Sequence, residues 1–385
     1  MQLLLGIIYL AFAGLGLPDS LLGAAWPAMY EGFGVPVSYA GILSMIIAVG
    51  TIVSSLGSDW LTQRLGAGKV TAISVGLTAL ALLGFSASSS FGQLCLWAVP
   101  YGLGAGSVDA ALNNYVALHY ASRHMSWLHC MWGVGASLGP YIMGYALTGG
   151  QGWNSGYRSV ALLQAGVTIV LAVSLPLWQK SMAAGAAGGT PSRAVPLRAA
   201  MRLPGVRETM AAFFCYCAIE QTTGLWGSSY LVLHQGFSPE AAARFASLFF
   251  LGITAGRAIS GFLTMWLTDA KLVRLGQGIL LAGIGALLHP AGGSWAAAGL
   301  LLIGLGCAPI YPSLIHATPA RFGAAHSQAI VGIQMASAYA GTCLMPPLFG
   351  LLAQPLGIAC LPAWLLLLLA MLAFLHEKAV QKTWC

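Results

Sequence analysis

Residues 104–109 read Gly-Ala-Gly-Ser-Val-Asp, and the same pattern of two glycines and an aspartate stands 90 residues earlier, where residues 14–19 read Gly-Leu-Gly-Leu-Pro-Asp. Both copies place the acid, Asp109 or Asp19, deep inside a hydrophobic stretch. A third acid, Glu220, lies in a similar stretch. A charged side chain at the centre of a bilayer costs at least about 2.5 kcal/mol, so such residues usually face a cavity or a partner. Three of them predict a pathway for a substrate or an ion.

The composition is that of a membrane protein. The 385 residues are 58% hydrophobic and 6% charged, with a mean hydropathy of +0.81, whereas soluble domains carry about 25% charged residues. Spans of about 20–25 residues joined by short loops allow about twelve helices. The expected spans are roughly 3–30, 37–59, 70–90, 92–120, 126–148, 157–178, 206–233, 239–268, 272–290, 292–318, 324–353 and 356–376.

The net charge of +7 is interpreted as a signal of topology and predicts no nucleic-acid partner. If both termini lie inside, most of the basic residues fall on the cytoplasmic side, as the positive-inside rule requires. We therefore expect a multi-pass protein of the cell (inner) membrane with both termini in the cytoplasm.

The sequence lacks the motifs of several other classes. The eight cysteines form neither a redox CxxC pair nor a zinc-binding set, and no phosphate-binding GxxxxGK[ST] loop or HExxH motif occurs. We expect no enzyme activity, no metal and no cofactor.

A small-residue, basic segment at 179–207 divides the chain into an N-terminal bundle, residues 1–178, and a C-terminal bundle with a short tail, residues 208–385. It has the composition of a flexible linker. The two parts match at a constant offset of 202 residues. The matched pairs are Gly50 and Gly252, Lys69 and Lys271, Gly102 and Gly304, Gly104 and Gly306, His124 and His326, and Gly139 and Gly341.

These repeats predict an all-α membrane protein whose twelve transmembrane helices form two pseudo-symmetric six-helix bundles. Three spans repeated in inverted topology, then doubled, is a known plan of transporters. Asp19, Asp109, Gln221 and Tyr311 take equivalent places in spans 1, 4, 7 and 10, which line a central cavity in that plan. Glu220 lies next to one of these places.

The chain resembles a known family at these residues. The twelve-span plan, Asp19, and residues 104–115 with an asparagine pair after the aspartate are similar to the fucose/galactose/glucose–proton symporter family of the major facilitator superfamily. That family has an acid in each of spans 1 and 4. Residues 63–69 resemble the superfamily motif between spans 2 and 3, except that Gln63 replaces its aspartate and Asp59 lies one turn earlier. The resemblance implies proton-coupled symport.

Asp109, Asp19 and Glu220 are the candidates for proton coupling. A carboxyl group in a poorly solvated cavity holds its proton more readily than in water, so it could load and unload during transport. A structural alternative stays open for each acid. Asp19 follows Pro18 and could satisfy backbone groups that the proline frees, and Glu220 could be a permanent partner of Arg257.

Arg257 is the candidate gate residue, because it lies toward the cytoplasmic part of span 8. A lone arginine in a membrane needs a counter-charge or a route to the interface. We expect it to join a gate with Asp59 or Glu220, with Arg64 in the same cytoplasmic set. Binding of an anionic substrate is the alternative.

Amides and aromatic rings are the candidates for substrate binding. Asn113 lies one helical turn after Asp109 on the same face, beside Asn114, and amides suit hydroxyl-rich ligands. Hydrogen bonds between helices are the alternative. His129 and Trp132 share a face early in span 5, although His129 could instead be a packing residue.

Three further residues belong to this set. Gln334 is the repeat partner of Trp132, and Trp26 and Trp226 lie about two turns beyond Asp19 and Glu220. Sugar rings present C–H faces that stack on aromatic rings. Interfacial positions for the tryptophans are the alternative.

The leading hypothesis is a secondary active transporter that couples proton entry to symport of a small polar solute, with a sugar as first candidate, by alternating access. A proton-driven exporter (antiporter) of an amphipathic or cationic compound is the main alternative, and a transport-dead sensor is a third. The partners expected are the solute and the lipid bilayer, and the protein is expected to be a monomer. Sodium could replace the proton, because the same oxygen-rich residues could coordinate it.

Overall fold

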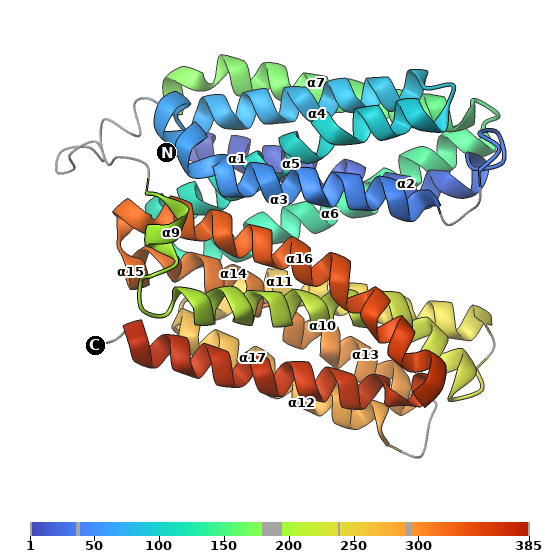
Figure 1. The fold of residues 1–385 in the computed structure, drawn as a ribbon, viewed down its shortest axis with the longest axis vertical. Coiled ribbons are helices and arrows are strands. Elements are labelled where there is room, and N and C mark those ends of the chain that lie inside the picture. The colour runs from blue at the N-terminus through green and yellow to red at the C-terminus, as the bar shows by residue number, and fades with distance from the viewer. Residues whose placement is uncertain (1, 36–38, 179–194, 238, 290–293, 384–385) are drawn as a thin grey trace. The chain divides into compact units, whose positions relative to one another are not determined.

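The computed structural model describes residues 2–35, 39–178, 195–237, 239–289 and 294–383, and these contain helices and no strand (Figure 1). The chain divides into two compact units. Unit 1 comprises Met1–Tyr115 and Met131–Pro196, and unit 2 comprises Val116–Cys130 and Leu197–Cys385. Most of the linker expected at 179–207 falls on 179–194, outside the described residues, and the expected domain boundaries stay a prediction.

Unit 1 is built from the first six spans. Its helices are α1 (Gln2–Asp19), α2 (Leu21–Ala25), α3 (Ala40–Leu65), α4 (Ala67–Ala87), α5 (Phe91–His119), α6 (Ser122–Thr148) and α7 (Gly152–Val173). The end of α5 and the start of α6 belong to unit 2. The core of unit 1 is an apolar cluster that includes Leu21, Trp26, Leu82, Phe85 and Tyr101.

Unit 2 holds the last six spans. Its helices are α9 (Leu197–Ala200), α10 (Val206–Leu233), α11 (Pro239–Leu263), α12 (Asp269–Leu287), α13 (Ser294–Cys307), α14 (Ile310–His316), α15 (Thr318–Phe322), α16 (Ala324–Leu356) and α17 (Leu361–Thr383). Helix α10 packs against α16 and α17, and α13 packs against α11 and α12.

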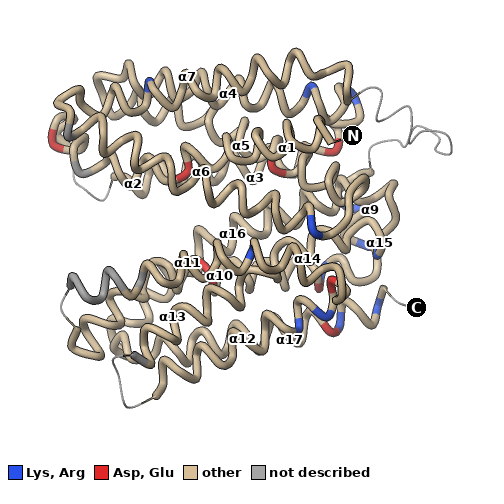
Figure 2. Tube along the Cα trace, turned by 180° about the vertical axis from the view of Figure 1, so that it is seen from behind, with Lys and Arg blue, Asp and Glu red and all other residues tan. Residues whose placement is uncertain are grey.

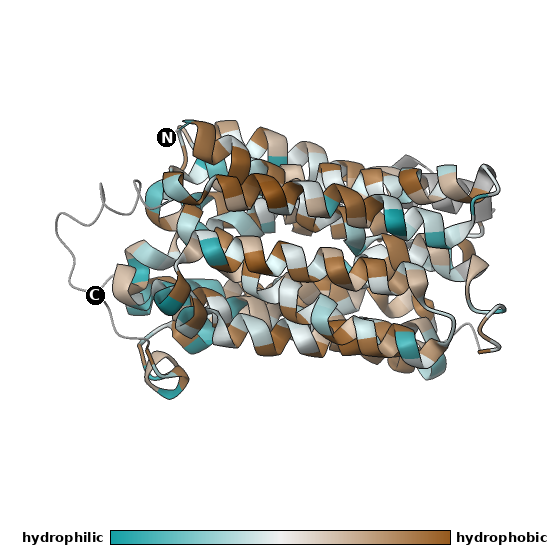
Figure 3. Cartoon of the chain, turned by 90° about the horizontal axis from the view of Figure 1, so that it is seen from above, coloured by the Kyte–Doolittle hydropathy of each residue, from teal (hydrophilic) through white to brown (hydrophobic). Residues whose placement is uncertain are grey.

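The all-α membrane fold is confirmed. Within the described residues, eight helical segments are long and apolar enough to cross a membrane. Figure 3 shows hydrophobic residues distributed along the helices. The long helices α5, α6, α10 and α11 complete the set of twelve. Three of them, α5, α6 and α10, carry polar side chains such as Asp109, His129 and Glu220. The described apolar part of α11, Ser247–Leu263, is shorter than the other spans.

The 202-residue repeat is visible in the backbone packing. A Cβ atom at Gly102 would lie 2.3 Å from the carbonyl oxygen of Ile47, and one at Gly304 would lie 2.1 Å from that of Phe249. Both residues of the second pair are 202 positions after those of the first, so spans 2 and 4 meet as spans 8 and 10 do. A second pair of contacts shows the same offset of 202 residues. A Cβ atom at Gly104 would lie 2.7 Å from the carbonyl oxygen of Ser74, and one at Gly306 would lie 2.8 Å from that of Gly276.

The 90-residue echo is visible in the same way. A Cβ atom at Gly16 would lie 2.1 Å from the carbonyl oxygen of Trp132, and one at Gly106 would lie 2.2 Å from that of Thr51. Span 1 therefore touches span 5 where span 4 touches span 2, which is the exchange expected when three spans are repeated. Asp19 lies three residues after Gly16, and Asp109 lies three residues after Gly106.

One end of unit 2 carries most of its charged residues (Figure 2). This basic end is defined by Arg207, Arg274, Arg321, Lys378 and Lys382. Two ion pairs tie its helices together. Arg274 donates to both oxygens of Glu377 at 2.7 and 2.8 Å, and Lys382 Nζ lies 2.5 Å from Glu208 Oε1.

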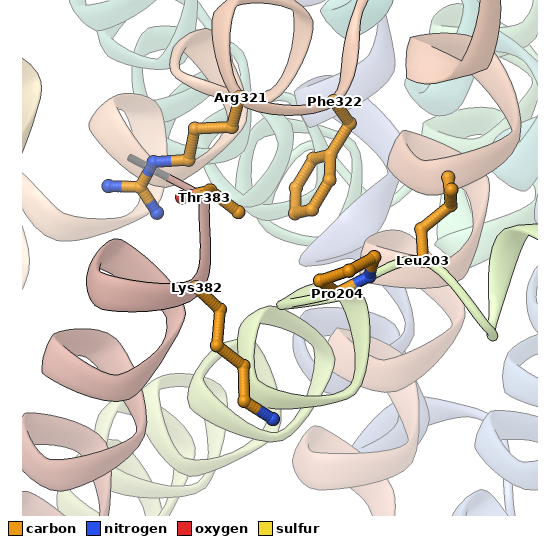
Figure 4. Close-up of a pocket in the computed structure, with 6 residues that line it drawn as sticks. All are labelled: Leu203, Pro204, Arg321, Phe322, Lys382 and Thr383. Carbon is orange, nitrogen blue, oxygen red and sulfur yellow. The ribbon is translucent and has the colours of Figure 1, made fainter. Parts of the chain in front are cut away.

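A pocket of about 190 Å³ opens at the basic end, between α15, the end of α17 and the chain before α10. Figure 4 shows the ring of Phe322 near Pro204, whereas the charged groups of Arg321 and Lys382 point away from each other. The positive charges of these two residues are therefore not focused on one point.

Candidate transport site

Asp19 lies at a break in the first span. Helix α1 ends at Asp19, one residue after Pro18, and α2 begins at Leu21. Trp132 Nε1 donates to Asp19 Oδ2 at 2.8 Å, and the Tyr101 hydroxyl donates to Oδ1 at 3.3 Å. The Asp19 side chain is exposed to solvent, so lone pairs of both oxygens remain open to a ligand.

Ser20 fixes this break from the other side. Its hydroxyl donates to the carbonyl oxygen of Ala136 on α6 at 2.7 Å. The interruption is a single residue, because Ser20 stays in the right-handed helical region and the Ala24 N–H donates to its carbonyl oxygen at 3.2 Å. The exposed Asp19 carboxylate thus has one partly buried donor, Trp132, and one buried donor, Tyr101.

Asp109 and Asn113 form a second polar pair in unit 1. Both are buried, with exposed fractions of 5% and 0%. Asn113 Nδ2 donates to Asp109 Oδ1 at 2.8 Å and to its main-chain oxygen at 2.9 Å. The expected shared face is confirmed. Asn114 is buried beside them.

Glu220 and Arg257 form an ion pair in unit 2, with Arg257 Nη2 3.6 Å from Glu220 Oε1. The Tyr216 hydroxyl donates to the other carboxylate oxygen of Glu220. The pairing that the sequence left open for Glu220 is therefore present. A buried pair of this kind leaves an uncompensated charge when one partner is lost, so the two side chains depend on each other.

Tyr311 lies in an aromatic cluster next to this ion pair. Its ring centroid is 4.7 Å from that of His129, 4.7 Å from that of Phe213 and 5.8 Å from that of Tyr216. Its hydroxyl donates to Met335 Sδ at 3.3 Å. The repeat partner of Asp109 thus packs on Tyr216, which is hydrogen-bonded to Glu220.

The remaining residues of the expected binding set are dispersed. Gln334 is buried, and it accepts from Thr318 Oγ1 at 2.9 Å and donates to the Leu314 carbonyl at 3.4 Å. It therefore holds the broken span 10 against α16. Gln221 is exposed. Trp26 lies in the apolar core of unit 1, with 4% of its surface exposed.

Trp226 borders a larger cavity of unit 2. Its Nε1 donates to the Pro346 carbonyl at 2.9 Å, and the cavity of about 570 Å³ is also lined by Leu233, Pro347 and Gln354. The side chain is half-buried and anchored by its ring nitrogen, so its ring face is fixed in place.

The two expected gate residues of unit 1 have local partners. Asp59 accepts from Gln63 Nε2 at 3.1 Å and from the backbone N–H of Val195 at 2.9 Å. Asp59 thus holds the described end of the linker. The guanidinium of Arg64 lies 4.2 Å from the ring centroid of Trp60.

Sequence reasoning missed Tyr101, Tyr216 and Phe213. Tyr216 lies four residues before Glu220, so helical spacing could have found it. Tyr101 comes from another helix than its partner Asp19, and no local signal links them. Within the described residues, no group of three His, Cys, Asp or Glu side chains could hold a metal ion.

Two repeated six-helix bundles, with acids at matched positions inside membrane helices, define a membrane transporter. The chain belongs to the Major Facilitator Superfamily, whose family model matches residues 8–346. The members of this family are transporters rather than enzymes.

The relatives are distant. The chain is 28% identical over 371 residues to the uncharacterized transporter y4wD of Sinorhizobium fredii, with 89% of this chain and 90% of the relative covered. It is 23% identical over 279 residues to Bypass of stop codon protein 6 of Saccharomyces cerevisiae, which covers 66% of this chain but only 55% of the yeast protein. The crystal structure of the E. coli fucose:proton symporter FucP matches with a TM-score of 0.74 at 16% identity, over 99% of this chain and 98% of that one. This likeness shows the fold.

Proposed function

We propose that this transporter couples proton entry to uptake of a small polar solute, with sugars as the leading class, by alternating access. The observation that carries the proposal is the exposed carboxylate of Asp19 with its two donors, Trp132 and Tyr101. An acceptor group beside aromatic rings suits a ligand that has both hydroxyl groups and apolar C–H faces. The structural likeness to a fucose:proton symporter supports the same class.

The acids have different proposed roles. Asp109 is the principal proton carrier, since its carboxyl group is buried and accepts a hydrogen bond from the neutral amide of Asn113. Asp19 serves substrate recognition. Glu220 and Arg257 form a gate, and their ion pair lies within unit 2.

The proposed setting is the cell (inner) membrane, with both termini in the cytoplasm and the protein acting as a monomer. The excess of basic residues at the basic end of unit 2 supports this orientation under the positive-inside rule. The basic end is then cytoplasmic. The coupling ion is H+, with Na+ as the competing ion.

Uptake by proteoliposomes tests the function. Purified protein is reconstituted, and accumulation of labelled monosaccharides is measured with a pH gradient, with a sodium gradient and with neither. Accumulation of a sugar that requires the pH gradient and dissipates with a protonophore is expected. Accumulation driven only by sodium would reject proton coupling, and no uptake of any sugar would reject the substrate class.

Export of an amphipathic cation is the second candidate, because an exposed carboxylate beside a tryptophan would also attract a cation. The direction of solute movement under a given pH gradient separates the two functions. Under an inside-acid gradient, an antiporter with H+ accumulates a dye cation in the vesicle, whereas a symporter loses preloaded solute.

A further inference from the structure

We propose that Asp269 and His316 form a second proton-binding site at the basic end of unit 2, and that the bound proton holds the segment Val116–Cys130 in place. The segment contains the end of α5 and the start of α6 and packs as part of unit 2. Asp269 is the first residue of α12, and His316 is the last of α14. Neither residue belongs to the transport site described above.

Four groups form this site, which we call the latch: Asp269, His316, Tyr120 and Ser122. His316 Nδ1 lies 2.6 Å from Asp269 Oδ2, and His316 Nε2 lies 3.2 Å from the main-chain oxygen of Tyr120. The Ser122 hydroxyl donates to Asp269 Oδ1 at 2.5 Å. The acid and the histidine are mostly buried, with side-chain exposures of 17% and 20%.

The partners fix the proton count of the latch. A carbonyl oxygen only accepts, so His316 Nε2 must carry a hydrogen to bond Tyr120. The contact between Nδ1 and the Asp269 carboxylate needs a second hydrogen, either on the ring or on the acid. Both contacts together therefore require one proton more than a neutral histidine beside an ionised aspartate.

Loss of that proton breaks one of the two contacts. A neutral imidazole has a single N–H, so it can donate to Asp269 or to Tyr120 but not to both. If it keeps Tyr120, a ring lone pair faces the carboxylate. Proton binding and attachment of the segment are thus the same event, and an alkaline medium weakens the latch.

Other charges surround the latch without replacing its chemistry. Arg321 on α15 interacts electrostatically with Asp269, Arg274 and Glu377. The remaining basic residues and histidines on the elements around the latch are Lys271 on α12, His376, Lys378 and Lys382 on α17, and His119, Arg123, His124 and His129 on the segment. None of these removes the need for a second hydrogen between His316 and Asp269.

The latch would regulate the alternating access proposed above, and this physiological role rests on the proposed function. If the basic end is cytoplasmic, an acidic cytoplasm keeps the segment attached and disfavours opening to that side. Uptake would then slow as protons accumulate inside, which is feedback by the product of the coupling reaction. The two contacts are geometric facts that do not depend on the substrate.

Hydrogen–deuterium exchange of residues 116–130 tests the latch on the full-length protein in lipid nanodiscs without any substrate. Wild type and His316→Gln are compared at the same pH, so that the intrinsic exchange rate cancels. At about pH 5.5, well below the usual histidine pKa of about 6.5, wild type should exchange about tenfold more slowly, as expected for loss of one charge-assisted hydrogen bond. At about pH 8.5 the two should agree.

Two further variants make the outcome decisive. Asp269→Asn should abolish the pH dependence, since it removes the carboxylate while keeping an acceptor for Ser122. His326→Gln at the start of α16 is the matched control and should behave as wild type. Exchange in α4 reports whether each variant is folded. The proposal would be overturned if the ratio of the His316→Gln exchange rate to the wild-type rate were the same at both pH values. It would also be overturned if His326→Gln changed the exchange rate as much as His316→Gln does. The result stands apart from the uptake assays, because no solute is present.

Discussion

At the scale of single residues, the two aspartates of unit 1 have opposite environments. This difference predicts that substitution of each aspartate impairs a different step of transport. Asp109 is buried on Asn113, whereas Asp19 is exposed. Asp109→Asn mimics the protonated acid, so binding and counterflow should persist while accumulation against a gradient is lost. Counterflow and proton-driven uptake are measured on one preparation. Full accumulation by Asp109→Asn would transfer the role to Glu220.

Trp132 gives a second residue-scale prediction. Trp132→Phe keeps a ring but removes the N–H that bonds Asp19, so the half-saturation concentration for the solute should rise about tenfold, the effect of one hydrogen bond to a charged group. Asp19→Asn should weaken binding further. Trp153→Phe is the control, since Trp153 packs on Phe33 and Tyr157 through its ring. An unchanged half-saturation concentration in Trp132→Phe would remove Trp132 from the recognition site.

Residue-scale prediction from sequence succeeded where helical spacing was enough. Asp109 and Asn113 share a face because they are four residues apart, and the structure bonds them. Tyr101 was out of reach, since its contact with Asp19 joins residues 82 positions apart and depends on how α5 packs. Gln334 was placed by repeat symmetry, which fixes its helix position but not its hydrogen-bond partners.

At the scale of helices, close backbone contact at Gly304 predicts a large cost for the smallest substitution. A Cβ atom there would lie 2.1 Å from the Phe249 carbonyl oxygen, so Gly304→Ala must separate α11 and α13. Overpacking of this kind costs roughly 1–3 kcal/mol, and thermal unfolding should occur at a lower temperature. Gly278→Ala on α12 is the control, because its Cβ meets no atom within 4 Å. Equal unfolding temperatures for the two variants would contradict the contact.

The positions of the helices followed from the sequence, but their internal breaks did not. Long apolar runs with few charges fix the spans, because only a helix satisfies its backbone inside a bilayer. Span 10, expected as one helix at 292–318, is divided into α13, α14 and α15. Membrane helices tolerate prolines when neighbours satisfy the freed backbone groups, so the sequence alone could not tell that Pro309 marks a break while Pro100 stands inside continuous α5.

At the scale of the whole molecule, the repeats were the strongest signal in the sequence. Offsets of 202 and 90 residues reappear as matched glycine contacts between helices. A repeat copies backbone geometry, since a glycine that lets two helices touch is needed in each copy. It does not copy side-chain chemistry: Tyr311 replaces the acid of Asp109 and packs on aromatic rings instead.

The orientation of the molecule in the membrane is the last prediction, and it decides which compartment the latch senses. Basic residues near short loops are retained in the cytoplasm, and Arg274, Arg321 and Lys382 all lie at the basic end of unit 2. A reporter that folds only in the cytoplasm should therefore be active when fused after Cys385, and inactive when inserted at Gly150. A phosphatase that needs the opposite side should give the reverse pattern. The reverse result for both reporters would put the latch outside, where Asp269 and His316 would respond to external acid and close the protein when the driving gradient is largest, a poor arrangement for uptake.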